Sequence, residues 1–88
     1  MRAKWFTDRL DACTPPRGFL TREAAVSDAQ SDLDTNNRPR RIEHGMLILI
    51  SKTGHTCYIG KPESFRLCGF EWGYKQIKRI ETDGLGLA

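Results

Sequence analysis

A run of five apolar residues, 46–50, places the strongest constraint on how this 88-residue chain can fold. A second β-favouring stretch, 55–59, follows it after the short polar segment 51–54. β-Branched and aromatic residues suit a pleated, half-buried surface, and Gly54 tolerates the positive φ that a reversal of direction requires. The pattern therefore predicts a central β-hairpin over about residues 46–59.

The apolar run also predicts how the hairpin is covered. An antiparallel strand with one wet face alternates apolar and polar residues, whereas five consecutive apolar residues indicate a strand covered on both faces. Only one helix has strong local signals, so something else has to cover the second face. The C-terminal segment, a second copy of the chain in a homodimer, or a different protein are the three alternatives, and we favour the C-terminal segment.

Residues 21–34 carry the signals of this main helix. Thr21 is a suitable N-cap, and Glu23 lies in the first turn, where the positive end of the helix dipole favours an anion. One stripe of the helix is rich in small apolar residues and consists of Ala25, Val26, Ala29 and Leu33. We therefore expect the helix to pack closely on one face of the sheet.

Weaker signals precede and follow the main helix. Residues 3–10 favour a strand, although helical spacing is the alternative there. Two prolines and a glycine in residues 14–18 predict a loop. Residues 38–41 hold three arginines and a proline, for which a solvated loop is the preferred interpretation.

The C-terminal third has mixed patterns. Residues 64–68 alternate well enough to predict a third strand, and Gly69 and Gly73 suggest bulges or a tight bend. Residues 74–81 favour a short helix only narrowly over a strand. The predicted fold is a single α+β domain over residues 1–88, with a small antiparallel sheet built on the hairpin and one main helix on one face.

Cysteine content and hydropathy predict a cytoplasmic protein. Cys13, Cys57 and Cys68 cannot all pair within the chain, whereas small secreted domains usually carry an even, dense set. The longest apolar run is far shorter than the roughly 20 residues of a membrane-spanning helix, and Asp8 and Asp11 interrupt any signal-peptide core. We therefore expect no membrane partner.

The net charge of +3 is unevenly distributed along the chain. Residues 21–37 contain one basic and four acidic residues, whereas residues 38–61 contain five basic and one acidic residue. The predicted helix is therefore acidic and the hairpin with its lead-in is basic, which favours an anionic partner on the sheet side.

Two basic groups interleave with aromatic residues that could stack on single-stranded bases. The candidate binding residues are Arg38, Arg40, Arg41, Trp72, Tyr74, Lys75, Lys78 and Arg79. No nucleic-acid-binding motif accompanies them, and the total charge is small beside the basic surfaces of nucleic-acid-binding proteins. A nucleic-acid-binding regulator is therefore kept as an alternative function.

The residues that could carry metal or catalytic chemistry form no recognised motif. The potential zinc ligands are His44, His55, Cys57 and Cys68, and their spacing matches no common zinc site, so a small zinc-stabilised module is a second alternative. The sequence has no phosphate-binding glycine loop, no paired-carboxylate pattern and no serine elbow. We therefore expect no enzyme activity and no cofactor.

The segment 19–25, Phe-Leu-Thr-Arg-Glu-Ala-Ala, resembles the Phe-x-Thr-x-x-Ala-Ala signature of strand exit and helix entry in many small phage and prophage accessory proteins. That class includes anti-CRISPRs and other inhibitors of host defence, which often pair one helix with a small antiparallel sheet and act by stoichiometric binding. The resemblance implies a non-enzymatic protein that inhibits or modulates a host protein. It transfers no functional residue, because the class has no shared site motif.

Overall fold

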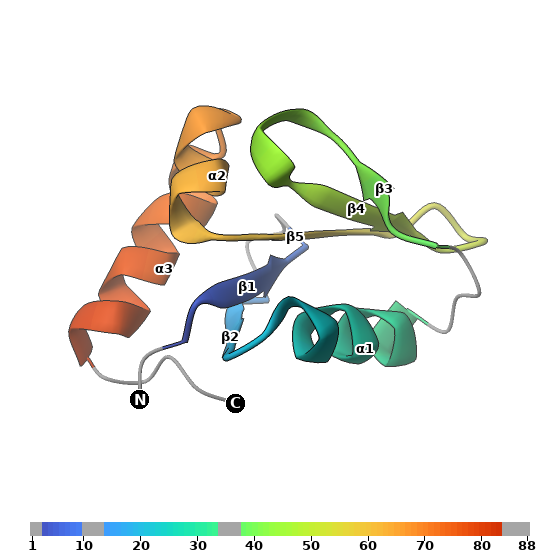
Figure 1. Cartoon of the computed structure of the whole chain (residues 1–88), viewed down its shortest axis with the longest axis horizontal. Helices are drawn as coiled ribbons and strands as arrows, with labels where there is room; N and C mark the ends of the chain where they lie inside the picture. Colours follow the sequence, from blue (N-terminus) through green and yellow to red (C-terminus); the bar gives the residue numbers. More distant parts are fainter. Residues whose placement is uncertain (1–2, 10–13, 34–37, 84–88) are drawn as a thin grey trace.

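Figure 1 shows the computed structural model, which describes residues 3–9, 14–33 and 38–83. A five-stranded antiparallel sheet has the strand order β2-β1-β5-β4-β3. Its strands are β1 (Trp5–Asp8), β2 (Arg17–Phe19), β3 (Arg40–Arg41), β4 (Leu47–Ile50) and β5 (Thr56–Gly60). Helix α1 (Arg22–Leu33) packs along one face, and α2 (Pro62–Leu67) and α3 (Glu71–Asp83) stand together at the far end of the molecule, on the left in Figure 1. The predicted α+β class is confirmed.

The central hairpin forms as predicted. In the β4–β5 pair, Leu47 lies opposite Ile59 and Leu49 lies opposite Cys57. These four side chains are buried on the face that α1 covers. Gly54 adopts a φ of +88° in the turn, where an L side chain would be strained.

Helix α1 begins where the N-cap signal placed it. The Thr21 hydroxyl oxygen accepts a hydrogen bond from the Ala24 N–H at 3.2 Å, which satisfies one of the unpaired amides of the first turn. Ala25 and Ala29 are buried against the sheet, and Val26 packs partly buried beside them. The side chain of Leu33, the fourth residue of the predicted stripe, lies outside the described part of the structure.

Both sheet edges are strands where the sequence predicted loops. The predicted strand at 3–10 is confirmed as β1, but the predicted loop at 14–18 is wrong in its second half, because β2 begins at Arg17 and pairs with β1. The predicted loop at 38–41 is likewise wrong, because Arg40 and Arg41 pair with β4. Both edges are set by pairing with a neighbouring strand and not by local propensity.

The predicted third strand at 64–68 is also wrong, because this segment lies in helix α2. Pro62 occupies the first turn, where its missing N–H leaves no hydrogen bond unmade. Arg66 donates hydrogen bonds to the Glu63 carboxylate one turn earlier, which lowers the pKa of Glu63. Phe65 is fully buried and anchors the helix in the core.

Gly69 ends α2 in a left-handed conformation with a φ of +83°. The Phe70 N–H donates to the Phe65 carbonyl at 2.9 Å and the Gly69 N–H donates to the Arg66 carbonyl at 3.1 Å, which together form a Schellman motif. The rings of Phe65 and Phe70 supply its hydrophobic contact, with centroids 6.3 Å apart. The predicted bulge at Gly69 is therefore a helix C-cap.

Helix α3 confirms the helical interpretation of residues 74–81 and begins before it, at Glu71. Gly73 lies inside the first turn and not in a bulge, which corrects the prediction for that residue. A Cβ at Gly73 would overlap the Asp8 carboxylate at the end of β1. Gly73 therefore permits the close approach of α3 to the sheet, with the buried Asp8 side chain beside the first turn of the helix.

Candidate functional site

Four strands place one residue each in a row across the second face of the sheet, the face opposite α1. Asp8 is paired with Tyr58, Tyr58 with Ile48, and Ile48 with Arg40. Side chains of directly paired residues lie on the same face of an antiparallel sheet, so this row shows how far the second face is covered.

Coverage decreases steadily along this row. Asp8 is 2% exposed beneath α3, and Phe70 packs on Tyr58 edge to face with ring centroids 4.8 Å apart. Ile48 is only half-buried, and Arg40 is exposed. The C-terminal helices therefore cover the β1 and β5 part of the second face and leave the β4 and β3 part open.

The prediction that both faces of residues 46–50 are covered is therefore only partly right. Met46 is fully buried with Phe6, Phe65 and Ile77 in the core beneath α2 and α3. Ile50, four residues further along the strand, is 37% exposed. The C-terminal segment does fold over the second face, as we favoured, but its helices end before they reach the far end of β4.

The uncovered part of this face combines aliphatic and cationic side chains. Arg38, Arg40, Ile48 and Ile50 line a shallow hollow of about 130 Å³, and we call these four residues the open half-face. Among the described residues, none of those that line it is acidic. Two of the sequence-predicted site residues, Arg38 and Arg40, thus lie here, beside two isoleucines that the sequence analysis did not assign to a site.

Both edges of the sheet resist the addition of another strand. Strand β3 has two residues and follows Pro39, and β2 has three residues and follows Pro16. Proline has no N–H to donate, and short, charged edge strands are poor templates for pairing with another chain. A partner is therefore better accommodated on the open half-face than along an edge.

A larger groove lies on the α1 side of the same edge. It has a volume of about 490 Å³ and is lined by Arg22, Glu23, Val26, Ser27, Gln30, Arg38, Pro39 and Leu47. Arg38 lines both this groove and the hollow of the open half-face. The chain at Arg38 and Pro39 is thus a ridge with a concave surface on either side.

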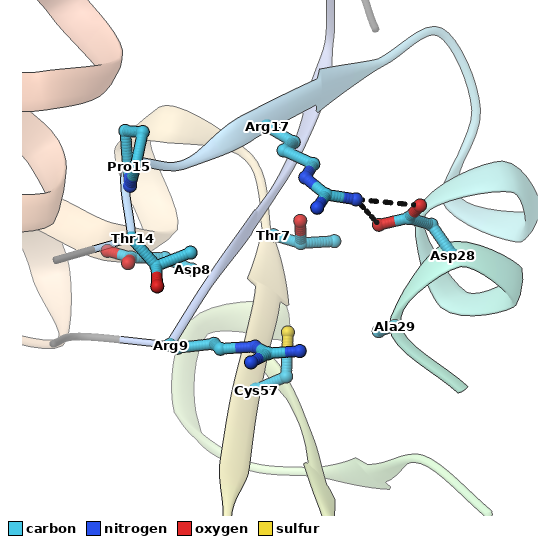
Figure 2. A pocket seen from close by; sticks show the side chains of 9 residues that line it. All are labelled: Thr7, Asp8, Arg9, Thr14, Pro15, Arg17, Asp28, Ala29 and Cys57. Atoms are coloured by element: carbon cyan, nitrogen blue, oxygen red, sulfur yellow. Dashed lines mark hydrogen bonds and ion pairs between the residues drawn. The ribbon is translucent and has the colours of Figure 1, made fainter. Parts of the chain in front are cut away.

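Figure 2 shows a third, much smaller pocket between β1, β2 and α1. Arg17 Nη1 donates to both carboxylate oxygens of Asp28 at 3.2 Å and so ties β2 to α1 (Figure 2). Cys57 and Ala29 are also among the lining residues. The volume of about 10 Å³ is close to that of a single water probe, so this pocket has no room for a substrate.

The second basic group lies on α3, away from the open half-face. Lys75, Lys78 and Arg79 are exposed, and Trp72 is 41% exposed. Trp72, Lys75 and Arg79 share one face of the helix, because they follow the i, i+3, i+7 spacing. Tyr74 instead packs partly buried against the core, with Lys78 Nζ 5.5 Å from its ring centroid.

The two basic groups do not form a continuous surface. Figure 1 places α3 at the left of the molecule and β3 towards the right, with the sheet between them. Arg41 is also separated from Arg40, because alternate residues of a strand point to opposite faces and Arg41 pairs with the buried Leu47. A single strand of nucleic acid would have to cross the sheet to contact both groups.

The four potential zinc ligands are distributed over different parts of the fold. Cys57 is buried on the α1 face, and His55 precedes β5 at the turn of the hairpin. His44 and Cys68 lie closer together, where the 3₁₀ turn Glu43–Gly45 meets α2. Within residues 3–9, 14–33 and 38–83, no group of three or more His, Cys, Asp or Glu side chains is placed to hold a metal ion.

Cys68 is held against this 3₁₀ turn. Its thiol donates to the Glu43 carbonyl oxygen at 3.4 Å, and Ser64 Oγ donates to the neighbouring His44 carbonyl at 2.7 Å. Burial, and then the charge of Glu43, raises the pKa of the Cys68 thiol. The thiol is thus kept protonated, which is the opposite of the activation that a nucleophilic cysteine requires.

Sequence reasoning missed Ile48 and Ile50 as site residues because nothing local distinguishes them from the buried Leu47 and Leu49. The alternation of strand faces does place the two isoleucines on one side, but their exposure depends on where the C-terminal helices end.

No helix in the described ranges is both long enough and apolar enough to span a bilayer. No protein-family model, curated protein or solved structure matches the chain.

Proposed function

We propose that this chain is a non-enzymatic binding protein that docks a partner protein on its open half-face. The observation that carries the proposal is the partial covering of the central sheet, which leaves Ile48 half-buried and Ile50 37% exposed beside two arginines. Exposed aliphatic residues bordered by charged groups are typical of protein–protein contact surfaces.

The energetics indicate that these isoleucines form the centre of a larger interface. Full burial of an isoleucine contributes about 1.5–3 kcal/mol, so burying the part of Ile50 that is still exposed contributes about 0.5–1 kcal/mol. Ile48 adds a similar or smaller amount. Together they account for roughly a tenfold change in affinity, and the surrounding polar side chains have to supply specificity and additional contacts.

The resemblance of residues 19–25 to phage accessory proteins supports a host protein as the partner and inhibition by occlusion as the mode of action. We include a cytoplasmic location in this proposal. It is supported by the odd number of cysteines and by the positions of Cys57 and Cys68, which lie in different core clusters and form no disulfide with each other.

Affinity capture from a bacterial lysate with matched variants tests the proposal. The Ile48→Thr/Ile50→Thr variant keeps β-branched residues in β4 while removing apolar surface, and we expect it to lose the protein that the unaltered chain retains. Leu67→Ser is the control, because Leu67 is 47% exposed on α2, away from the open half-face. Retention of the same protein by the double variant, or loss only with Leu67→Ser, would refute the proposed surface.

A nucleic-acid-binding regulator is the second candidate, and one observation favours it. Trp72, Lys75 and Arg79 lie on one exposed face of α3, where an aromatic ring and two cations could contact a single strand. Lys75→Glu/Arg79→Glu should then abolish retention of single-stranded DNA at low salt and leave protein capture unchanged. If the unaltered chain does not shift the DNA at low salt, this candidate is excluded.

A further inference from the structure

We infer that the open half-face binds an acidic amphipathic helix of the partner protein, with the aliphatic side chains of that helix on Ile48 and Ile50 and its carboxylates beside Arg38 and Arg40. This inference rests on the proposed function and specifies the chemistry of the partner. It is drawn from the charge of the surface, the shape of the sheet and the nature of its edges.

The charge of the surface favours an anionic partner. Arg40 is the register partner of Ile48, so a cation lies directly beside the exposed aliphatic surface. Arg38 lines the same hollow, and no carboxylate is found among the lining residues that belong to the described part of the chain. The row of paired residues across this face also contains the acidic residue Asp8. It lies at the end of the row that is far from Arg40, and it is buried beneath α3. Complementary charges steer a partner into place and disfavour partners of the same sign.

The shape of the sheet favours a helix over a strand. Addition of a strand would use an edge, and each edge is a short strand that begins directly after a proline. The open half-face instead presents side chains of β3 and β4, and a helix is the element that commonly packs across a sheet face. The opposite face of the sheet is already covered by a helix in this way, because Ala25 and Ala29 of α1 pack on Leu47 and Leu49.

A second copy of the chain is a less suitable occupant. In a two-fold symmetric dimer the same patch meets itself, so Arg38 and Arg40 of the two copies would be brought towards each other. Like charges across an interface disfavour association. The same arginines that oppose self-association attract an acidic partner.

Designed peptides test this inference directly. The probe is a peptide of about 18 residues, long enough to form a helix, with leucines at i, i+3, i+4 and i+7 spacing and glutamates on both flanks. One control peptide has lysine in place of every glutamate, and another has serine in place of every leucine. Binding is followed by the δ1-methyl NMR signals of Ile48 and Ile50, with those of the fully buried Ile59 and Ile77 as internal references.

We expect the glutamate–leucine peptide to shift the Ile48 and Ile50 signals and both control peptides to bind at least about tenfold more weakly. Arg38→Glu/Arg40→Glu should reduce binding of the glutamate–leucine peptide by a similar factor. Raising the salt concentration should also weaken it, because exposed charges are screened over about 8 Å at physiological ionic strength. Stronger binding of the lysine peptide or of single-stranded DNA, concentration-dependent dimerisation through this face, or no shift at millimolar peptide would each overturn the inference.

Failure of this inference can be distinguished from failure of the proposed function. If a captured protein is lost with Ile48→Thr/Ile50→Thr but is retained equally by Arg38→Glu/Arg40→Glu at every salt concentration, the partner docks here without acidic complementarity. In that case the proposed surface stands and the inferred chemistry is wrong. If the isoleucine variant retains the partner, the surface itself is wrong.

Discussion

The close approach of Gly73 to Asp8 predicts that Gly73→Ala has opposite effects on stability in the unaltered chain and in an Asp8→Ala variant. In an ordinary helix interior, Gly73→Ala would stabilise the protein by about 1 kcal/mol through helix propensity. Here the new Cβ would overlap the Asp8 carboxylate, a short side chain that is 2% exposed and has little room to move. Overpacking of this kind typically destabilises by about 1–3 kcal/mol. We therefore expect a net loss of up to about 2 kcal/mol for Gly73→Ala.

Removal of the Asp8 carboxylate should reverse this sign. In an Asp8→Ala background the new Cβ would instead meet Phe65 Cδ1 at 3.5 Å, which is an ordinary van der Waals contact. Gly73→Ala should then stabilise by about 0.5–1 kcal/mol through helix propensity. Asp8→Ala alone should destabilise, because it removes most of a side chain that is 2% exposed and leaves a cavity beneath α3.

Urea unfolding followed by far-ultraviolet circular dichroism measures all four members of this double-mutant cycle. The expected coupling free energy is about 1–3 kcal/mol. Lys75→Ala is the control for a substitution on the exposed side of α3 and should change stability by less than about 0.5 kcal/mol. Stabilisation by Gly73→Ala of equal size in both backgrounds would show that α3 does not approach β1 as closely as the structure indicates.

Three further predictions concern the sheet, α1 and Cys68. Leu49→Ala should destabilise by about 2–5 kcal/mol because Leu49 is fully buried, whereas Ile50→Ala on the exposed side should cost less than half as much; equal losses in chemical denaturation would contradict the one-sided cover. Thr21→Ala should cost about 1 kcal/mol, measured in the same way, and no loss would argue against its capping hydrogen bond. In a Cys13→Ser background, Cys68 should react with iodoacetamide at pH 8 more slowly than in the unfolded chain, because burial and Glu43 raise its pKa. Equal rates, with the alkylated residue identified by mass spectrometry, would disprove this.

Segments with strong local signals are the ones that sequence reasoning placed correctly. Thr21 and the small-residue stripe identified α1, and the apolar run with Gly54 identified the hairpin. Residues 64–68 were misassigned because their few apolar residues fit either period. The structure distinguishes them, since Phe65 is fully buried and Leu67 is 47% exposed. Pro62 followed by an acidic residue was the local cue for a helix start there.

Features that depend on distant parts of the chain could not be predicted. Strands β2 and β3 have three and two residues, too few to carry a periodic signal, and they exist because β1 and β4 pair with them. The sequence identified Arg38 and Arg40 as candidates, but not their proximity to Ile48 and Ile50. That proximity is decided by strand register, and the exposure of the isoleucines is decided by where α2 and α3 stop covering the sheet.

Solvent accessibility of the isoleucine methyl groups tests most directly whether half of this sheet face is open. A soluble gadolinium chelate broadens NMR signals of methyl groups that solvent can approach. We expect strong broadening for Ile48 and Ile50 and little for Ile59 and Ile77, which are fully buried on opposite faces of the sheet. Protection of Ile48 and Ile50 equal to that of Ile59, in the isolated protein at low concentration, would mean that another part of the chain covers this face and that it is not a binding surface.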